Sequence, residues 1–150
     1  TGARWASDVQ VGDTVQVFGP RGSLVVGGSS VVVGDETSLG LVCAQGPEPR
    51  AVLEVTSPSD VQAALDALEL SGITLVERAA DDAHGPALVD AVARALAEPS
   101  PAGHARAAEL VSSGRAAAIQ IVRRGLKARG IDLGRGRTKA YWAPGKTGLD

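Results

Sequence analysis

The chain is poor in cysteine, aromatic residues and methionine. It holds one cysteine in 150 residues, Cys43, so neither an internal disulfide nor a cysteine-only zinc site can form. Aromatic residues make up 3% of the chain and methionine is absent, so the core has to be built from valine, leucine, isoleucine and alanine. Because Cys43 lies in an apolar helical pattern, we expect it to pack in that core.

The chain also lacks a strong charge and a long hydrophobic run. Its net charge is -2 at pH 7, which does not favour nucleic acid as the main partner. No apolar run approaches the roughly 20 residues that cross a membrane, and we recognise no signal peptide. We therefore expect no membrane insertion and a location in the cytoplasm. Hydrophobic residues make up 44% of the chain, which is typical of a folded domain.

What is present is an alternation of short strand and helix patterns. Hydrophobic periodicity predicts strands at 31–33, 51–55, 73–76, 109–112 and 138–142. Helices are predicted at 37–44, from a cap at Ser59-Asp60 to about Leu70, from near Pro86 to about Ala97, and at 115–129. Five strands alternating with four helices indicate an α/β fold, a five-stranded parallel sheet with helices on both faces.

The segment before the first of these strands has another pattern. Residues 14–18 alternate with period two between turn signals, so residues 11–26 are predicted to be β. The sequence Gly27-Gly28-Ser29 is typical of a flexible joint. We therefore expect residues 1–27 and residues 28–150 to form separate parts of the chain.

The expected strand order brings two turns together. If the order is 3-2-1-4-5, the sheet reverses its winding between the first and fourth strands, where such sheets bind ligands. The turn of Gly34, Asp35, Glu36 and Thr37 meets the turn at 112–115 there, and both precede helix N-termini. That arrangement favours an anionic ligand, although two carboxylates stand where a dinucleotide fold usually has glycines.

Five short motifs follow one another in the order found in one flavoenzyme family. They are Arg4-Trp5-Ala6 with the turns at 12–13 and 19–23, the junction 34–37 with Leu39, Glu54-Val55, Gly114 with the helix through Leu126, and 140–142 with Gly145. In these motifs the chain resembles the siderophore-interacting protein family, flavin-dependent ferric-siderophore reductases on the ferredoxin-reductase plan. The resemblance implies that residues 28–150 are a ferredoxin-reductase-like NAD(P)-binding domain. It also implies that residues 1–27 are residual strands from the C-terminal end of an FAD-binding β-barrel.

The same resemblance implies a reaction. A hydride passes from NADH or NADPH to FAD, and electrons then reduce Fe(III) in a ferric siderophore, so no catalytic acid or base and no metal ligand is expected. The residues expected to contact FAD or the nicotinamide cofactor are Gly2, Ala3, Gly34, Asp35, Glu36, Thr37, Arg78, Gly114 and Arg115. Because most of the barrel is missing, we expect the isolated chain to be inactive and leave its oligomeric state open.

Two departures from the family pattern keep other functions open. Gly40 stands where the family usually has proline, and Arg115 stands where it usually has glutamate. The chain could therefore be a non-catalytic α/β module that binds a nucleotide or a partner protein. It could also belong to a related flavoenzyme with another electron acceptor.

The site residues have structural interpretations as well. Asp35 could cap a helix, and Thr37 could be an ordinary first-turn residue rather than a nicotinamide contact. Arg115 could bind a phosphate or be a solvated arginine at a helix start. Arg78 favours NADPH, because its cation can bind the 2′-phosphate, whereas the neighbouring Glu77 favours NADH, which lacks that phosphate. The choice between NADH and NADPH therefore stays open.

Three further sets of residues complete the candidates. The basic run Arg123, Arg124, Lys127 and Arg129 is a solvated helix face or a docking surface for an acidic ferric siderophore. His84 and His104 fall in predicted loops and lack a credible metal or triad partner, and we assign neither to chemistry. Tyr141-Trp142 flanks the flavin edge or packs in the core.

Overall fold

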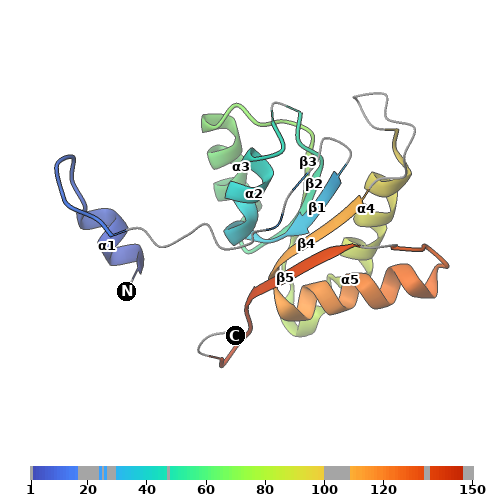
Figure 1. Ribbon diagram of the computed structural model, residues 1–150. Coiled ribbons are helices and arrows are strands. Elements are labelled where there is room, and N and C mark those ends of the chain that lie inside the picture. The colour runs from blue at the N-terminus through green and yellow to red at the C-terminus, as the bar shows by residue number, and fades with distance from the viewer. Residues whose placement is uncertain are drawn as a thin grey trace.

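The strands form one parallel sheet. The computed structural model describes residues 2–16, 24, 26, 30–46, 48–99, 109–133 and 136–146. Its strands are β1 (Ser30–Gly34), β2 (Ala51–Val55), β3 (Ile73–Glu77), β4 (Glu109–Arg115) and β5 (Arg137–Trp142). They pair in the order β3-β2-β1-β4-β5, with every neighbouring pair parallel (Figure 1). The predicted order is confirmed, and the switch point lies between β1 and β4.

Helices cover both faces of this sheet, as predicted (Figure 1). The helical elements are α1 (Gly2–Asp8), the 3-10 turn η1 (Glu36–Ser38), α2 (Leu39–Cys43), α3 (Pro58–Ala67), the 3-10 turn η2 (Ala80–Asp82), α4 (Gly85–Ala97) and α5 (Ala116–Ala128). The cap of α3 is Ser57 rather than Ser59, because Pro58 occupies the first helical position, where its missing N–H costs nothing. In the described ranges, none of the helices has both the length and the apolar character needed to span a membrane.

Successive residues of the central strands point to opposite faces and build two core layers. Val31 and Val33 pack against α4 and α5, while Val32 packs on the side of α2 and α3. Both β1 and β2 are buried along their whole length, as expected for central strands of a sheet covered on both sides. The strands are thereby held rigidly, and their carboxyl ends form a fixed edge of the molecule.

The segment before β1 differs from the prediction. Gly2 and Ala3, which were expected among the cofactor contacts at the end of the flavin barrel, lie in α1, and residues 9–16 contain no strand. Thr14–Gln16 therefore do not form the predicted strand, and residues 17–23 lie outside the described part of the chain. A strand needs hydrogen-bonded partners, and period two in a short segment does not supply them.

Cys43 is exposed, so the prediction that it packs in the core is wrong. The helix α2 has five residues, and its buried residue is the preceding Val42, which joins the core layer of α2 and α3. In so short a helix, adjacent positions lie about 100° apart, so burial of Val42 directs Cys43 toward solvent.

Candidate functional site

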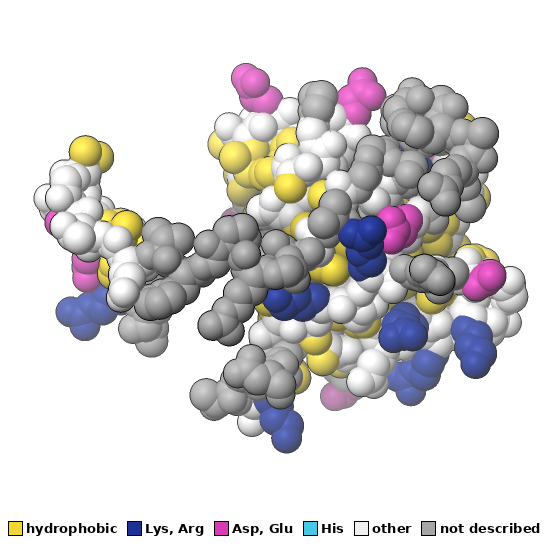
Figure 2. Space-filling model, viewed as in Figure 1, with side chains coloured by type: hydrophobic (Ala, Val, Ile, Leu, Met, Phe, Trp, Pro, Cys, Tyr) yellow, Lys and Arg dark blue, Asp and Glu magenta, His cyan; other side chains and the backbone are white. Residues whose placement is uncertain are grey.

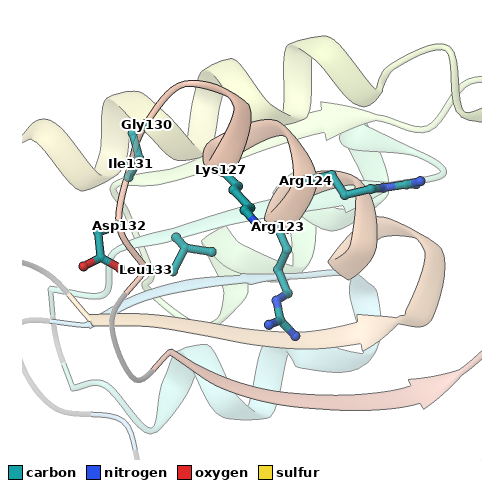
Figure 3. A pocket seen from close by; sticks show the side chains of 7 residues that line it. All are labelled: Arg123, Arg124, Lys127, Gly130, Ile131, Asp132 and Leu133. Carbon is teal, nitrogen blue, oxygen red and sulfur yellow. The ribbon is translucent and has the colours of Figure 1, made fainter.

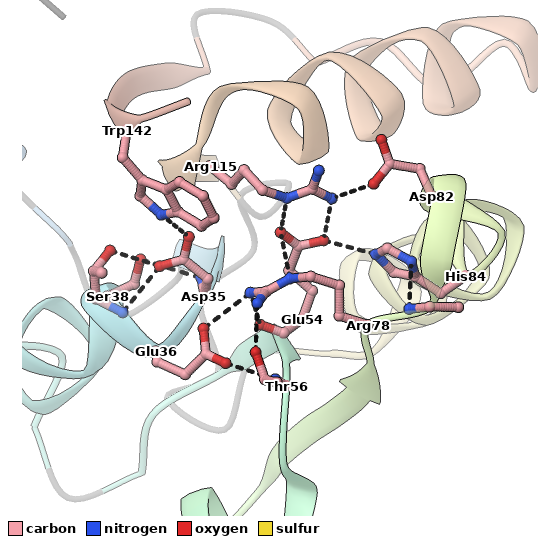
Figure 4. A network of polar contacts seen from close by, with 12 residues as sticks. Asp35, Glu36, Ser38, Glu54, Thr56, Arg78, Asp82, His84, Arg115 and Trp142 are labelled. Atoms are coloured by element: carbon pink, nitrogen blue, oxygen red, sulfur yellow. Dashed lines mark hydrogen bonds and ion pairs between the residues drawn. The ribbon is translucent and has the colours of Figure 1, made fainter. Parts of the chain in front are cut away.

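Polar side chains from all five strand ends meet at the carboxyl edge of the sheet (Figure 4). Asp35 follows β1 and Glu54 lies near the end of β2. Arg78 follows β3, Arg115 ends β4, and Trp142 ends β5. The network crosses the switch point between β1 and β4, so it occupies the edge where the sequence predicted a ligand.

Asp35 is a fully buried carboxylate that caps η1, which confirms the capping interpretation. Its Oδ1 accepts the backbone N–H of Thr37 at 2.9 Å and the hydroxyl of Thr37 at 2.5 Å. Its Oδ2 accepts the indole N–H of Trp142 at 2.7 Å. Asp35 therefore joins the first strand to the last one, across the switch point.

Two glycines leave the space that Asp35 and its helix need. A Cβ at Gly114 would lie 2.5 Å from Oδ2 of Asp35, and Gly114 has a φ of +91°, which other residues rarely adopt. A Cβ at Gly34 would lie 2.2 Å from the hydroxyl of Ser38. Gly34 and Gly114 therefore lie near each other, as predicted. Both glycines are in close contact with the segment between β1 and α2.

Glu54 is the centre of the network and is fully buried. Arg115 donates to it through two nitrogens, from Nε to Oε1 at 2.6 Å and from Nη2 to Oε2 at 2.8 Å. His84 approaches its Oε2 at 2.7 Å, and Nε of Arg78 lies 3.6 Å from Oε1. Burial by itself raises the pKa of Glu54, but the hydrogen bonds from Arg115 and His84 and the two positive charges outweigh it and lower that pKa.

The ring of His84 lies between two hydrogen-bond partners. The backbone N–H of Ala79 donates to its Nδ1 at 3.1 Å, so this nitrogen carries no proton. Nε2 therefore carries the ring proton and donates it to Glu54. His84, for which the sequence offered no metal or triad partner, thus contacts a buried carboxylate, whereas His104 lies outside the described residues. The sequence gave no signal of the contact between His84 and Glu54, because the two residues are 30 positions apart.

Arg115 is buried between two carboxylates. Besides Glu54, its Nη2 contacts Oδ1 of Asp82 at 2.6 Å, and both carboxylates raise its pKa further above an already high value. The hydrogen bond from Arg115 lowers the pKa of Asp82. Asp81 and Asp82 have positive φ values of 52° and 58°, a costly backbone for residues with a Cβ. The turn η2 is thus shaped so that Asp82 reaches Arg115.

This placement corrects one interpretation of the β4 end. The residues 112–115 were predicted to form a turn, but they continue β4 up to Arg115, and α5 begins at Ala116. Arg115 is not a solvated arginine, because its side chain is 6% exposed. Its predicted contact with a cofactor phosphate stays a prediction.

A second, more accessible group surrounds Arg78. Its Nη2 donates to Oε2 of Glu36 at 2.9 Å and its Nη1 donates to the hydroxyl of Thr56 at 2.6 Å. The backbone N–H of Thr56 donates to Oε1 of Glu36 at 2.6 Å, and the guanidinium lies 5.8 Å from the ring centre of Trp142. Burial raises the pKa of Glu36, but the hydrogen bonds from Thr56, its own N–H and Arg78 outweigh it and lower the pKa.

The edge therefore has a buried layer and an accessible layer. Asp35, Glu54 and Arg115 are buried, whereas the side chains of Arg78 and Glu36 are 20% and 35% exposed. Within the described ranges, no three His, Cys, Asp or Glu side chains group so that they could hold a metal ion. The arrangement can present a cation, a carboxylate and a hydroxyl to a ligand, and it holds their positions through buried ion pairs.

Comparison with known proteins returned no match: no protein-family model, no curated protein and no solved structure matches this chain.

Proposed function

We propose that this chain is the NADH- or NADPH-binding part of a flavin-dependent ferric-siderophore reductase. The observation that carries the proposal is the gathering of Asp35, Glu36 and Arg78 at the carboxyl ends of β1 and β3, next to the switch point with β4. In open parallel sheets, nucleotides bind at this edge. The motifs shared with the siderophore-interacting family support the particular reaction.

The chemistry of the accessible layer fits a nucleotide. Arg78 and Glu36 pair with each other but remain 20% and 35% exposed. Through these exposed parts the guanidinium can bind a phosphate, and the carboxylate can accept hydrogen bonds from ribose hydroxyls. The buried pair of Glu54 with Arg115 holds the neighbouring segments in position, since both side chains are at most 6% exposed. When bound, the reduced nicotinamide supplies a hydride.

The described residues do not fit a flavin site. The segment expected to belong to the flavin barrel contains α1 and no strand among residues 2–16. We propose that the isolated chain does not reduce a ferric siderophore.

The test is a titration of the chain with NADH and with NADPH. The Trp5→Phe variant leaves Trp142 as the single tryptophan, and its emission overlaps the absorption of reduced nicotinamide. We expect saturable energy transfer from Trp142 to the bound nucleotide. Arg78→Ala should weaken binding by about tenfold, because it removes the accessible cation.

The matched control is Arg94→Ala, which removes an exposed arginine from α4, outside the network. An equal loss of affinity in this control, or no saturation with either nucleotide, would contradict the proposal. Tight binding of FAD by the chain in a parallel titration would show that a flavin site is present after all.

One observation favours the second candidate, a non-catalytic α/β module. Arg115, which was expected to bind a phosphate, is already paired with Glu54 and Asp82. An anion that bound Arg115 would have to replace one of these partners at an energetic cost. A well-folded chain that binds neither nucleotide would support this candidate.

A further inference from the structure

The outer face of α5 is basic from its middle to its end. The helix buries Ala118, Ile119, Val122 and Leu126 against the sheet. Arg123, Arg124 and Lys127, which we call the α5 basic face, lie on the exposed side at helical spacings of three and four. Figure 2 shows Lys and Arg side chains gathered over the part of the surface where α5 lies.

Within the described part of the chain, no carboxylate forms an ion pair with any of these three side chains. Arg124 donates from Nε to the backbone oxygen of Gln120 at 3.3 Å, which leaves its charge uncompensated. The neighbouring Arg129, by contrast, is paired with Asp90 at 2.5 Å. The chain as a whole has a net charge of -2, so positive charge is concentrated on this face against the overall balance.

Stabilisation of the helix itself explains only part of this pattern. Cations stabilise a helix when they lie in its last turn, next to the carbonyl groups without partners. Lys127 lies in the last turn of α5, but Arg123 and Arg124 lie near its middle. The helix dipole therefore does not account for these two arginines.

A hollow lies on each side of the α5 basic face. The first has a volume of about 550 Å³ and is bordered by Arg123, Lys127, Ile131 and Leu133, with the carboxylate of Asp132 also in its lining (Figure 3). Ile131 and Leu133 are partly buried against the core, so they form an apolar floor. Arg124, which extends away from Arg123 in Figure 3, borders both this hollow and the second one.

The second hollow lies between α4 and α5 and also has a volume of about 550 Å³. Its lining includes Pro86, Val89, Ile121 and Ala128. The two helices approach closely at Gly125, which has no Cβ. A Cβ added there would lie 2.5 Å from the side chain of Val89. Two largely apolar hollows thus lie on either side of a row of cations, and the lining of each also contains one carboxylate, Asp132 in the first and Asp82 in the second.

We propose that this surface binds an acidic, amphipathic polypeptide segment of a partner protein. Apolar side chains of the segment would enter the two hollows, and its carboxylates would pair with Arg123, Arg124 and Lys127. Charge complementarity favours this partner, since exposed cations without a carboxylate partner can pair with the carboxylates of an acidic segment. Two apolar hollows on either side of those cations require a ligand with apolar groups on both sides of its charges.

The test uses a fluorescein-labelled synthetic peptide of leucine and glutamate, about 15 residues or four helical turns long. Its binding to the full chain is followed by fluorescence anisotropy. We expect saturable binding that weakens as salt rises, and a loss of about tenfold or more in affinity in the R123E/R124E/K127E variant. The control variant R4E/R94E/K146E reverses three exposed cations elsewhere and should change affinity by less than about twofold.

Three results would overturn the proposal. One is equal binding of a peptide with glutamine in place of glutamate. A second is a dimer of the chain that the R123E/R124E/K127E variant disrupts, which would assign the face to self-association. The third is binding to anionic lipid vesicles without binding to the peptide. Circular dichroism of both triple variants checks that they remain folded.

Discussion

At the scale of single residues, Glu54 connects more of the site than any other side chain described here. It is fully buried, and it holds Arg115, His84 and one nitrogen of Arg78 at the carboxyl edge. A buried ion pair gains little net stability when it is formed, but removing one partner leaves the other charge buried and uncompensated. The stability of the fold around this site should therefore depend on the charge of Glu54 and not only on the shape of its side chain.

The first prediction concerns that charge. Glu54→Gln keeps the size of the side chain but leaves Arg115 with Asp82 as its remaining carboxylate partner. We expect the free energy of unfolding to fall by about 3 kcal/mol. In the control Glu109→Gln, an exposed pair with Arg137 is lost, and the fall should be below about 1 kcal/mol. Urea unfolding of both variants measures the difference, and equal losses would contradict the argument.

The second prediction concerns pH. The pKa values of Glu36 and Glu54 are lowered in the folded chain from an ordinary value of 4.5, so both carboxylates stabilise the fold above about pH 4.5. This stabilisation should be lost as pH falls from 4.5 through the lower pKa values of the folded state. Unfolding free energies measured down this range should fall less steeply in Glu54→Gln. An unchanged slope would show that Glu54 does not contribute.

At the scale of elements, the junction of β4 with α5 decides how the site is assembled. Gly114 and Arg115 remain in the strand, where β4 pairs with β5, and the pairing shifts register between these two residues. This shift coincides with the positive φ of Gly114, and Asp35 fills the space beside that glycine. The strand end, and not the predicted turn, thus positions Arg115 toward Glu54.

The third prediction follows from this junction. Gly114→Ala adds a Cβ that would lie 2.5 Å from the Asp35 carboxylate, on a backbone with a φ of +91°. We expect a loss of about 3 kcal/mol in unfolding free energy. The matched control is Gly40→Ala in α2, where a Cβ would meet nothing within 4 Å. That variant should gain up to about 1 kcal/mol from helix propensity. Thermal unfolding of both compares them, and a neutral Gly114→Ala would show that Asp35 can move away.

At the scale of the whole molecule, the sheet with its two helical layers contains both cores. The described side chains of α1 are exposed, and Trp5 is 57% exposed. Leu24 and Val26, in contrast, are partly buried against the core layer of α2 and α3. The expected boundary at residue 27 stays a prediction, although these two side chains pack with the part that follows it.

The fourth prediction tests this division. Deletion of residues 1–16 removes α1 but leaves Leu24 and Val26 in place. Because the removed side chains that the structure describes bury little surface, the unfolding free energy should change by less than about 0.5 kcal/mol. Urea unfolding of the shortened chain measures this. A large loss of stability would show that α1 contributes to the same cooperative unit.

The sequence alone determined the elements and their order. Continuous runs of valine and leucine, helical apolar spacing and the Asp35 cap are local signals, so β1, β2 and α4 were predictable. Their alternation favoured a parallel sheet, for which the order 3-2-1-4-5 was one arrangement and is the one the structure has. Tertiary structure decided which charges meet. Glu54 and Arg115 are 61 residues apart, and His84 lies between them in a segment with no local pattern. Their pairing depends on strands that are adjacent only in the folded sheet, and burial of Arg115 likewise depends on those neighbours. Local periodicity contains no information on either, which is also why Cys43 and residues 11–16 were predicted wrongly.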